Sequence, residues 1–444
     1  MKFFLILLLF FVLACSSNKE VVDLDLFRKG EKINVNNIDN IFNKEIEAKN
    51  TLQLSIPQIN KSSDYEFCRS NNLCPHFVYE GLFTDVNEKS IGSYINKNNK
   101  NGSIVASNNS IFFSDEKGNI YNYDYVNNKI IWEIKIYDST YNSIPKNISL
   151  LVNNNYLFAS DNLGYIYSID VKNGKVVWQS NYGVSFSSNL NLYKDILYVT
   201  NQNGRLYSFN SVDGQKLISF ETLSGIINAK KDNISIFNNV LVFSNDVGNV
   251  TALDLDKKKV LWSKNIILQN YLNANKVFSI PNILIDNSNV YVSSNLGDLY
   301  CVQIDTGIVK WSYHFLSSQN HIVNETYLFV LTDNGYVVAF DKNKGNILWS
   351  TNINKTPSNI EVSKSFFSIS DDKKDINEIN FYGLILGSNN LYLTSSDGFL
   401  YKISATEGKL ILKKKINDQL TRAPIIIDNK LIIINNSASL ILIN

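Results

Sequence analysis

The sequence predicts an all-β protein, an eight-bladed β-propeller whose blades have four strands each and whose last blade is closed by an N-terminal strand. Three observations predict this fold. One sequence unit recurs eight times, mostly at about 40–45 residues. Each copy divides into short apolar stretches separated by turns, and the last copy stops before its final stretch. Four strands per unit at this period is typical of propeller blades.

Each copy is organised around a turn glycine. Glycine adopts positive φ without steric cost, and the residues after it alternate between apolar and polar, which indicates a hairpin leading into a strand. The spacing widens only between the sixth and seventh copies, and the polar stretch 368–380 is expected to be an exposed loop there. The turn positions are Gly118, Gly164, Gly204, Gly248, Gly297, Gly335 and Gly398, with Ala438 in the last copy.

All five tryptophans share one register, fourteen residues after the turn glycine. Ile218 and Leu412 take this place in two other copies, and a second glycine recurs at the tenth position except where Asn128 and Lys258 replace it. Such strict spacing favours a structural role, in which each indole packs between neighbouring blades, over a ligand-stacking role. The tryptophans are Trp132, Trp178, Trp262, Trp311 and Trp349.

The ring has to be closed by the N-terminus. The chain ends at Asn444, after the inner hairpin of the eighth copy, so that copy lacks its outer strand. Residues 79–91 fit the missing strand, with Phe83 expected where tryptophan stands elsewhere. Closure within one blade removes the open sheet edges that would invite aggregation.

The first residues are a targeting signal rather than part of the fold. Residues 1–14 carry a short apolar run, too short to span a bilayer, which is typical of a secretory signal peptide. Val12-Leu13-Ala14-Cys15 resembles a lipobox, so Cys15 is the expected lipidation site and lipid-bearing first residue; an ordinary signal with an incidental cysteine is the alternative. Residues 15–50 are expected to form a polar tether, with a short helix around 38–48, and residues 51–444 the propeller.

Composition excludes several function classes. Forty-two basic against 41 acidic residues argue against nucleic-acid binding. Three histidines and four cysteines leave little material for a metal site, and no metal or cofactor is expected. Cys68 and Cys74 flank a short segment and are expected to form a disulfide in an oxidising compartment, with two free thiols as the alternative. Cys301 lies within a predicted strand and is expected to be a buried free thiol.

The repeat Gly-x-h-x-Ala/Ser-h-Asp-x-x-x-Gly-x-h-h-Trp, where h is apolar, resembles the quinoprotein-type (PQQ-like) repeat. Eight copies, a lipobox and a chain of this length are similar to the BamB family of outer-membrane assembly lipoproteins. The resemblance implies a lipid-anchored protein of the outer membrane that faces the periplasm. It also implies binding to a BamA-like, POTRA-bearing outer-membrane protein and other assembly subunits, and a role in inserting outer-membrane proteins.

The resemblance places the docking loops between middle blades. The corresponding candidates for partner binding are Leu223, Ile226 and Ile227. Tyr271 and Leu272 are the next candidates, because they are apolar and fall in a segment without a strand assignment. The first segment lacks the arginine of the family pattern, and Lys276-Val277-Phe278 lacks its acidic pair. The alternative for these apolar residues is burial against the blade.

Two other functions compete with this interpretation. Quinone-dependent alcohol and glucose dehydrogenases use the same repeat, but they need a vicinal cysteine pair or its equivalent and a Ca²⁺ site. This sequence has no adjacent cysteines, so we expect no enzyme activity. The second competitor is a periplasmic propeller that binds another protein or a polysaccharide, which neither the lipobox nor the repeat excludes.

Overall fold

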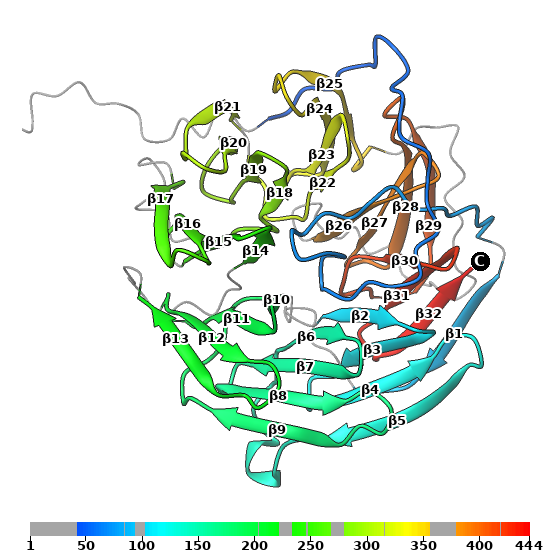
Figure 1. Ribbon diagram of the computed structural model, residues 1–444. Helices are drawn as coiled ribbons and strands as arrows, with labels where there is room; N and C mark the ends of the chain where they lie inside the picture. The colour runs from blue at the N-terminus through cyan, green and yellow to red at the C-terminus, as the bar shows by residue number, and fades with distance from the viewer. Residues whose placement is uncertain are drawn as a thin grey trace, which may run out of the picture. The chain divides into compact units, whose positions relative to one another are not determined.

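The computed structural model describes residues 42–444 except 84, 94–102, 203, 222–232, 246, 268–278, 315, 356–378 and 418. In this part of the chain, eight antiparallel sheets of four strands stand around a central channel (Figure 1). This confirms the predicted eight-bladed propeller. The helical content of the same residues is one short 3-10 helix, η1 (Ser139–Tyr141).

The first four blades follow one another along the chain, each built from its inner to its outer strand. Blade 1 contains β2 (Ile104–Ser107), β3 (Ser110–Ser114), β4 (Asn119–Asp124) and β5 (Lys129–Lys135). Blade 2 contains β6 (Ile148–Asn153), β7 (Tyr156–Asp161), β8 (Tyr165–Asp170) and β9 (Val176–Asn181). Blade 3 contains β10 (Asn191–Tyr193), β11 (Ile196–Thr200), β12 (Leu206–Asn210) and β13 (Lys216–Phe220). Blade 4 contains β14 (Ile234–Phe237), β15 (Val240–Ser244), β16 (Asn249–Asp254) and β17 (Lys259–Asn265).

The remaining blades complete the ring. Blade 5 contains β18 (Leu284–Asp286), β19 (Asn289–Val292), β20 (Leu299–Gln303) and β21 (Val309–Tyr313). Blade 6 contains β22 (Ile322–Val323), β23 (Tyr327–Leu331), β24 (Tyr336–Asp341) and β25 (Ile347–Asn352). Blade 7 contains β26 (Phe381–Gly387), β27 (Asn390–Ser395), β28 (Phe399–Ser404) and β29 (Leu410–Lys415). Blade 8 contains β30 (Ile425–Ile427), β31 (Lys430–Ile434), β32 (Ser439–Ile443) and β1 (Val86–Ser90).

Burial differs systematically across each blade. The second strands, such as β3 and β15, are buried on both faces because each blade is covered by its two neighbours, and they are correspondingly rich in Val, Ile, Leu and Phe. The outer strands face solvent; β21, for example, alternates between exposed and half-buried residues. The core is therefore a series of apolar layers between blades.

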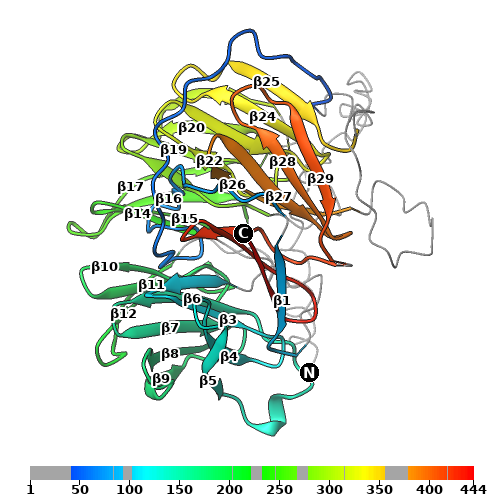
Figure 2. The ribbon, with the colours of Figure 1, turned by 90° about the vertical axis from the view of Figure 1, so that its right-hand side faces the viewer.

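The N-terminal closing strand is confirmed. β1 pairs antiparallel with β32 along its whole length, from Val86 opposite Ile443 to Ser90 opposite Ser439. Figure 2 shows β1 beside the C-terminal strand. The two ends of the propeller thus share one sheet.

The expectation that Phe83 replaces the tryptophan of this strand is wrong. In the blades that carry a tryptophan, it lies opposite the fourth residue after the turn glycine, as Trp262 lies opposite Ala252. The equivalent pair in blade 8 is Asn87 with Leu442. Phe83 precedes the strand at a φ of 59°. It is buried against blade 7, with its ring centroid 6.0 Å from that of Tyr392. The spacing to the next repeat did not locate the tryptophan position, because the chain turns at Phe83 and β1 begins only at Val86.

Residues 42–55 pack along blades 6 and 7 before the propeller's first strand. The Phe42 ring lies edge-on to Tyr336, with centroids 5.5 Å apart. Ile46 exchanges two backbone hydrogen bonds with Ser350 of β25, at 2.9 and 3.1 Å. The described part of the predicted 38–48 helix is not helical. The C-terminal end of the segment assigned as tether is therefore attached to a blade.

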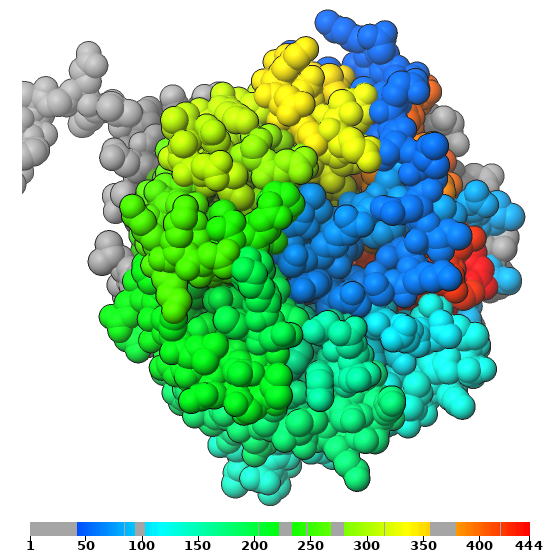
Figure 3. All heavy atoms as spheres, in the orientation of Figure 1, coloured from blue at the N-terminus to red at the C-terminus, as the bar shows by residue number. Residues whose placement is uncertain are grey.

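Residues 58–78, which we call the plug, enter the mouth of the central channel. An inner strand has one edge paired within its blade, while its other edge faces the channel with N–H and C=O groups that need partners. Figure 3 shows the N-terminal segment, in blue, crossing the centre of one face of the ring. The plug pairs with inner strands around the ring: Ser63 with Ala106, Asp64 with Val152, Ser70 with Ile236, Asn71 with Ile285 and Phe77 with Leu386.

Candidate functional site

A slot that holds a tryptophan recurs between neighbouring blades. Each tryptophan leaves the outer strand of one blade, and its ring lies over the glycine turn before the outer strand of the next. The indole N–H donates to a carbonyl of that next blade at 2.6–3.1 Å. The pairs are Trp132 with Val171, Trp178 with Ser211, Trp262 with Ile304, Trp311 with Lys342 and Trp349 with Ala405.

The glycine of each slot is required by the tryptophan of the preceding blade. A Cβ on Gly214 would lie 2.5 Å from Cε3 of Trp178, closer than packed atoms approach. Asn128 and Lys258 replace this glycine in blades 1 and 4, and both keep a positive φ, 53° and 54°. The preceding blades carry Asn87 and Ile218 at the tryptophan position, so a Cβ is tolerated there.

The slot between blades 3 and 4 is open as a result, and we call it the 3/4 groove. Ile218 is 46% exposed, whereas Trp262 at the same position of blade 4 is 9% exposed. The groove has a volume of about 420 Å³. Its lining is mainly apolar: Ile196, Tyr198, Leu206, Tyr207, Ser208, Leu217, Ile218, Phe220, Leu253, Leu255 and Lys258.

One lysine lines the 3/4 groove without an ion pair. Two other lysines of blades 3 and 4 are neutralised: Lys194 lies 2.9 Å from Asp256, and Lys257 lies 3.6 Å from Asp254. Within the described residues, Lys258 lines the groove and makes no ion pair. The groove therefore combines an apolar lining with a single unpaired lysine.

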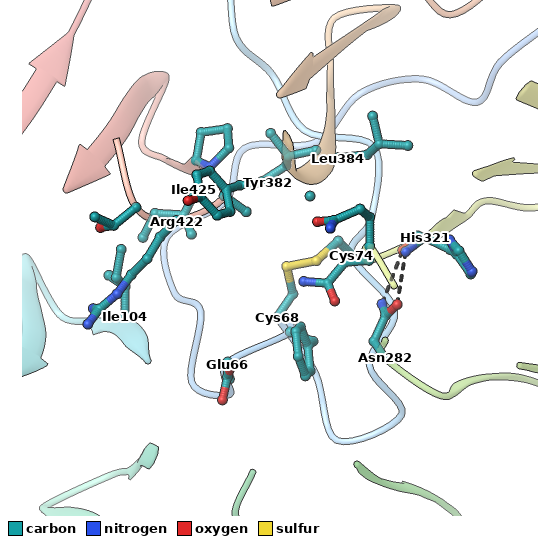
Figure 4. A pocket seen from close by; sticks show the side chains of 18 of the residues that line it. Glu66, Cys68, Cys74, Ile104, Asn282, His321, Tyr382, Leu384, Arg422 and Ile425 are labelled. Carbon is teal, nitrogen blue, oxygen red and sulfur yellow. Dashed lines mark hydrogen bonds between the residues drawn. A yellow bond between two sulfur atoms is a disulfide. The ribbon is translucent and has the colours of Figure 1, made fainter. Parts of the chain in front are cut away.

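A second cavity lies inside the channel, below the plug. It holds about 160 Å³ and is lined by plug residues, by the inner parts of blades 5 to 8 and by Ile104 of blade 1. Figure 4 shows the Cys68–Cys74 disulfide in its middle, with Arg422 on one side and His321 on the other. Burial lowers the pKa of His321 to about 3, so its ring is neutral, and its Nε2 lies 2.6 Å from Ser293 Oγ.

A buried arginine, Arg422, also lines the cavity. Burial lowers the pKa of Arg422 to about 10, with Glu66 opposing the shift, so the guanidinium stays charged near neutral pH. Outside the cavity, His314 lies at the surface, with its Nδ1 2.6 Å from Asp298 Oδ1. In the described part of the chain, no group of three or more His, Cys, Asp or Glu side chains is arranged to hold a metal ion.

The disulfide fixes the tip of the plug. Cys68 and Cys74 are six positions apart, and the enclosed Asn72 donates from its side chain to the carbonyls of Ile234 and Ile283 at 3.0 and 2.8 Å. Cys301 is a buried free thiol, and burial raises its pKa to about 11.

Replacing both plug cysteines by serine is expected to lower the free energy of unfolding by about 2 kcal/mol, because a short closed loop restricts the unfolded chain. Urea unfolding of the oxidised proteins measures the difference. Wild-type protein treated with dithiothreitol serves as the control and should show the same loss. An unchanged unfolding midpoint would mean that the plug is held by its backbone hydrogen bonds alone.

The predicted functional residues fall largely outside the described part of the chain. Cys15 precedes residue 42, Leu223, Ile226 and Ile227 lie in 222–232, and Tyr271 and Leu272 lie in 268–278. The nearest described strands along the chain are β13 and β14 around the first loop segment, and β17 and β18 around the second. Sequence reasoning missed the 3/4 groove, although Ile218 and Lys258 both depart from the repeat.

Comparison with known proteins identifies the family. The family model described as "Outer membrane protein assembly factor BamB" matches residues 85–219 and 149–351, together more than half of the chain. The chain belongs to the BamB family. Relatives named outer membrane protein assembly factor BamB include one from Moranella endobia, 20% identical over 54% of this chain and 56% of that protein. Another, from Shewanella oneidensis, is 21% identical over 55% and 58%.

The BamB relatives are matched over little more than half of their own length. Among solved structures, BamB from Moraxella catarrhalis superposes with a TM-score of 0.64 at 14% identity, over 82% of this chain and all of that one. A europium-containing methanol dehydrogenase superposes with a TM-score of 0.63 at 11% identity, over 84% and 89%. At these identities the structural likeness establishes the fold only. None of the described residues forms a helix long and apolar enough to cross a membrane.

Proposed function

We propose that this protein is a non-enzymatic scaffold lipoprotein of the outer-membrane β-barrel assembly machinery. In this role it binds a POTRA-bearing, BamA-like subunit and assists the insertion of outer-membrane proteins. The observation that carries the proposal is the BamB family match, which runs through the closing strand and blades 1 to 6.

The plug supports a scaffold role over an enzymatic one. A ring of blades has one deep central concavity, and here the chain's own residues enter it: Asn72 is buried between blades 4 and 5, and the disulfide lies beside it. Binding is then left to the rims and sides of the propeller, where loops and outer strands are accessible. The superposition on methanol dehydrogenase shows a shared fold and is no evidence for that enzyme's activity in this chain.

The anchor belongs to the same proposal. Residues 1–14 act as a lipoprotein signal peptide, Cys15 carries the lipid, and the protein stays on the periplasmic side of the outer membrane. Stable anchoring takes at least two acyl chains, which a lipidated N-terminal cysteine supplies. The tether then leads to Phe42, where the chain attaches to blade 6.

The docking surface proposed for the barrel subunit flanks blade 4. Connections 222–232 and 268–278 join blade 4 to blades 3 and 5, and they carry Leu223, Ile226, Ile227, Tyr271 and Leu272. The 3/4 groove reaches Phe220, the last residue of β13, after which the chain runs on to the first connection. An exposed apolar groove is typical of partner sites.

Replacing Ile226 and Ile227 together by Asp is expected to abolish co-purification with the barrel subunit, since two carboxylates would have to be desolvated in the interface. The measurement is crosslinking in membranes followed by mass-spectrometric identification of a POTRA-bearing protein. The control is the single substitution Ile411→Asp on blade 7. The Ile411 side chain is 47% exposed, and its replacement should leave binding intact. Wild-type protein that recovers a glycan or no POTRA-bearing protein would refute the proposed function.

A further inference from the structure

We infer that His76 is an acid-sensitive latch, which holds the end of the plug against blade 7 while its ring is neutral and releases it when the ring takes up a proton. The inference concerns regulation and does not depend on the proposed partner. Three observations support it: the ring joins three segments of the chain, its two contacts require one neutral form, and its surroundings disfavour the charged form.

The His76 ring joins segments that are far apart in the sequence. Its Nδ1 lies 2.7 Å from the carbonyl oxygen of Ser55, at the end of the segment that packs along blades 6 and 7. Its Nε2 lies 2.9 Å from the backbone nitrogen of Asn389, in the turn between β26 and β27 of blade 7. His76 itself belongs to the plug and is 3% exposed. One side chain therefore connects the plug, the segment before it and a blade.

Only one form of the ring satisfies both contacts. The Ser55 carbonyl can only accept a hydrogen bond, so Nδ1 must carry a hydrogen. The Asn389 N–H can only donate, so Nε2 must carry none. The ring is thus the neutral imidazole with its hydrogen on Nδ1. A proton taken up from solvent at Nε2 places a second N–H opposite that of Asn389, and the hydrogen bond to blade 7 is lost.

The surroundings of the ring favour the neutral form. Burial lowers the pKa of His76 below its ordinary value of 6.5. The hydrogen bond to Ser55 and the charge of Glu325, in the turn between β22 and β23 of blade 6, oppose this shift, but burial outweighs them. The contacts from the other two segments, Ser55 and Asn389, carry no charge. Because the closed latch takes up a proton less readily than a free histidine, it is fully closed above about pH 6.5 and weakens as the pH falls.

Opening the latch loosens the end of the plug. Directly beside the ring, Phe77 donates to the Leu386 carbonyl at 3.0 Å and accepts from the Ser388 N–H at 2.8 Å. Leu386 lies on β26, the inner strand of blade 7, whose residues 382–385 line the channel cavity. Separation at this point leaves the inner edge of β26 without its partners beside that cavity.

Hydrogen exchange of the full-length protein at about pH 7.5 and about pH 5, corrected for the pH dependence of intrinsic exchange, tests the inference. Backbone amides of residues 76–79 and 386–389 are expected to exchange about fivefold faster at the lower pH, since a hydrogen bond is lost and a charge is buried. The plug residue Ser63 pairs with Ala106 of blade 1 through two backbone hydrogen bonds, without a histidine. These two amides are the internal reference and should show no such change.

Two variants assign the effect to His76. His76→Gln supplies an uncharged side-chain oxygen as acceptor, so the amides of 386–389 should stay protected at both pH values. His321→Gln is the matched control, because it removes the other buried histidine, whose partner is Ser293, and acid sensitivity at 386–389 should persist. Unchanged exchange in the wild type, or an acid-induced rise that persists in His76→Gln, would overturn the inference.

A second measurement does not depend on how the variants fold. Nitrogen-15 NMR of the histidine-labelled wild type shows which ring nitrogen carries the hydrogen, and with three histidines in the chain the signals can be assigned by substitution. We expect the hydrogen of His76 on Nδ1 and a ring that titrates below its ordinary pKa of 6.5. A hydrogen on Nε2, or titration at or above that value, would contradict the latch.

Discussion

Replacing Trp349 by alanine is expected to lower the free energy of unfolding by about 3–5 kcal/mol, the cost of a large-to-small change in a packed core. Its side chain is fully buried between blades 6 and 7, and its N–H donates to Ala405 at 3.1 Å. The substitution removes the ring, leaves a void over Gly408 and deprives a buried carbonyl of its donor. Urea unfolding followed by far-ultraviolet circular dichroism measures the loss.

The control for this prediction is Ile218→Ala at the equivalent position of blade 3. Because Ile218 is 46% exposed, its truncation is expected to cost less than about 1 kcal/mol. Equal losses at the two positions would show that the indole contributes no more than a solvent-facing side chain, and the inter-blade packing would then be unimportant for stability.

Gly214→Ala is expected to destabilise the protein by about 2–5 kcal/mol, because a left-handed φ costs an L-residue about 1–2 kcal/mol and overpacking adds about 1–3. The φ of Gly214 is 73°, and the added Cβ would lie 2.5 Å from the Trp178 ring. Thermal and urea unfolding of the variant test the value.

Two further variants separate the backbone effect from the clash. Lys258→Ala, at the equivalent turn of blade 4, keeps a side chain at positive φ and is expected to change stability very little. Combining Gly214→Ala with Trp178→Ile imitates the 3/4 junction. The loss of stability in this double variant is expected to be smaller than the sum of the losses in the two single variants. Additive losses would contradict the dependence of the glycine on the tryptophan.

The repeat explains why so much of the fold was predictable. A blade is a local unit, so its turn glycine, its alternating strand and its tryptophan all appear within one stretch of sequence, and the missing outer strand of blade 8 requires β1. The coupling of Trp178 to Gly214 was not recognised, because it links one copy to the next rather than recurring within a copy. Its signal was present: Asn128 and Lys258 replace the glycine only after blades without tryptophan.

The plug was not predictable, because it is bound mainly through backbone groups. Any sequence supplies an N–H and a C=O, so the pairing of Ser63 with Ala106 or of Asn71 with Ile285 leaves no apolar pattern. Only side chains such as Asn60 and Asn72, which donate to inner-strand carbonyls, are specific, and isolated asparagines are common in this sequence. Of the candidate docking residues, the described structure covers none, so those assignments stay predictions.

Ring closure by β1 and the plug has a consequence for the order in which the protein is made. Residues 58–90 are synthesised early, but their partners in blade 8, at 425–443, are synthesised last. The free-energy cost of closing the loop between this segment and blade 8 grows only logarithmically with loop length, so the great length adds little to it. Contacts between segments so far apart in the sequence nevertheless form slowly. The nascent chain must therefore keep β1 unpaired until β32 emerges, and a chain that stops before β32 can still pair the plug with the earlier blades but cannot close blade 8.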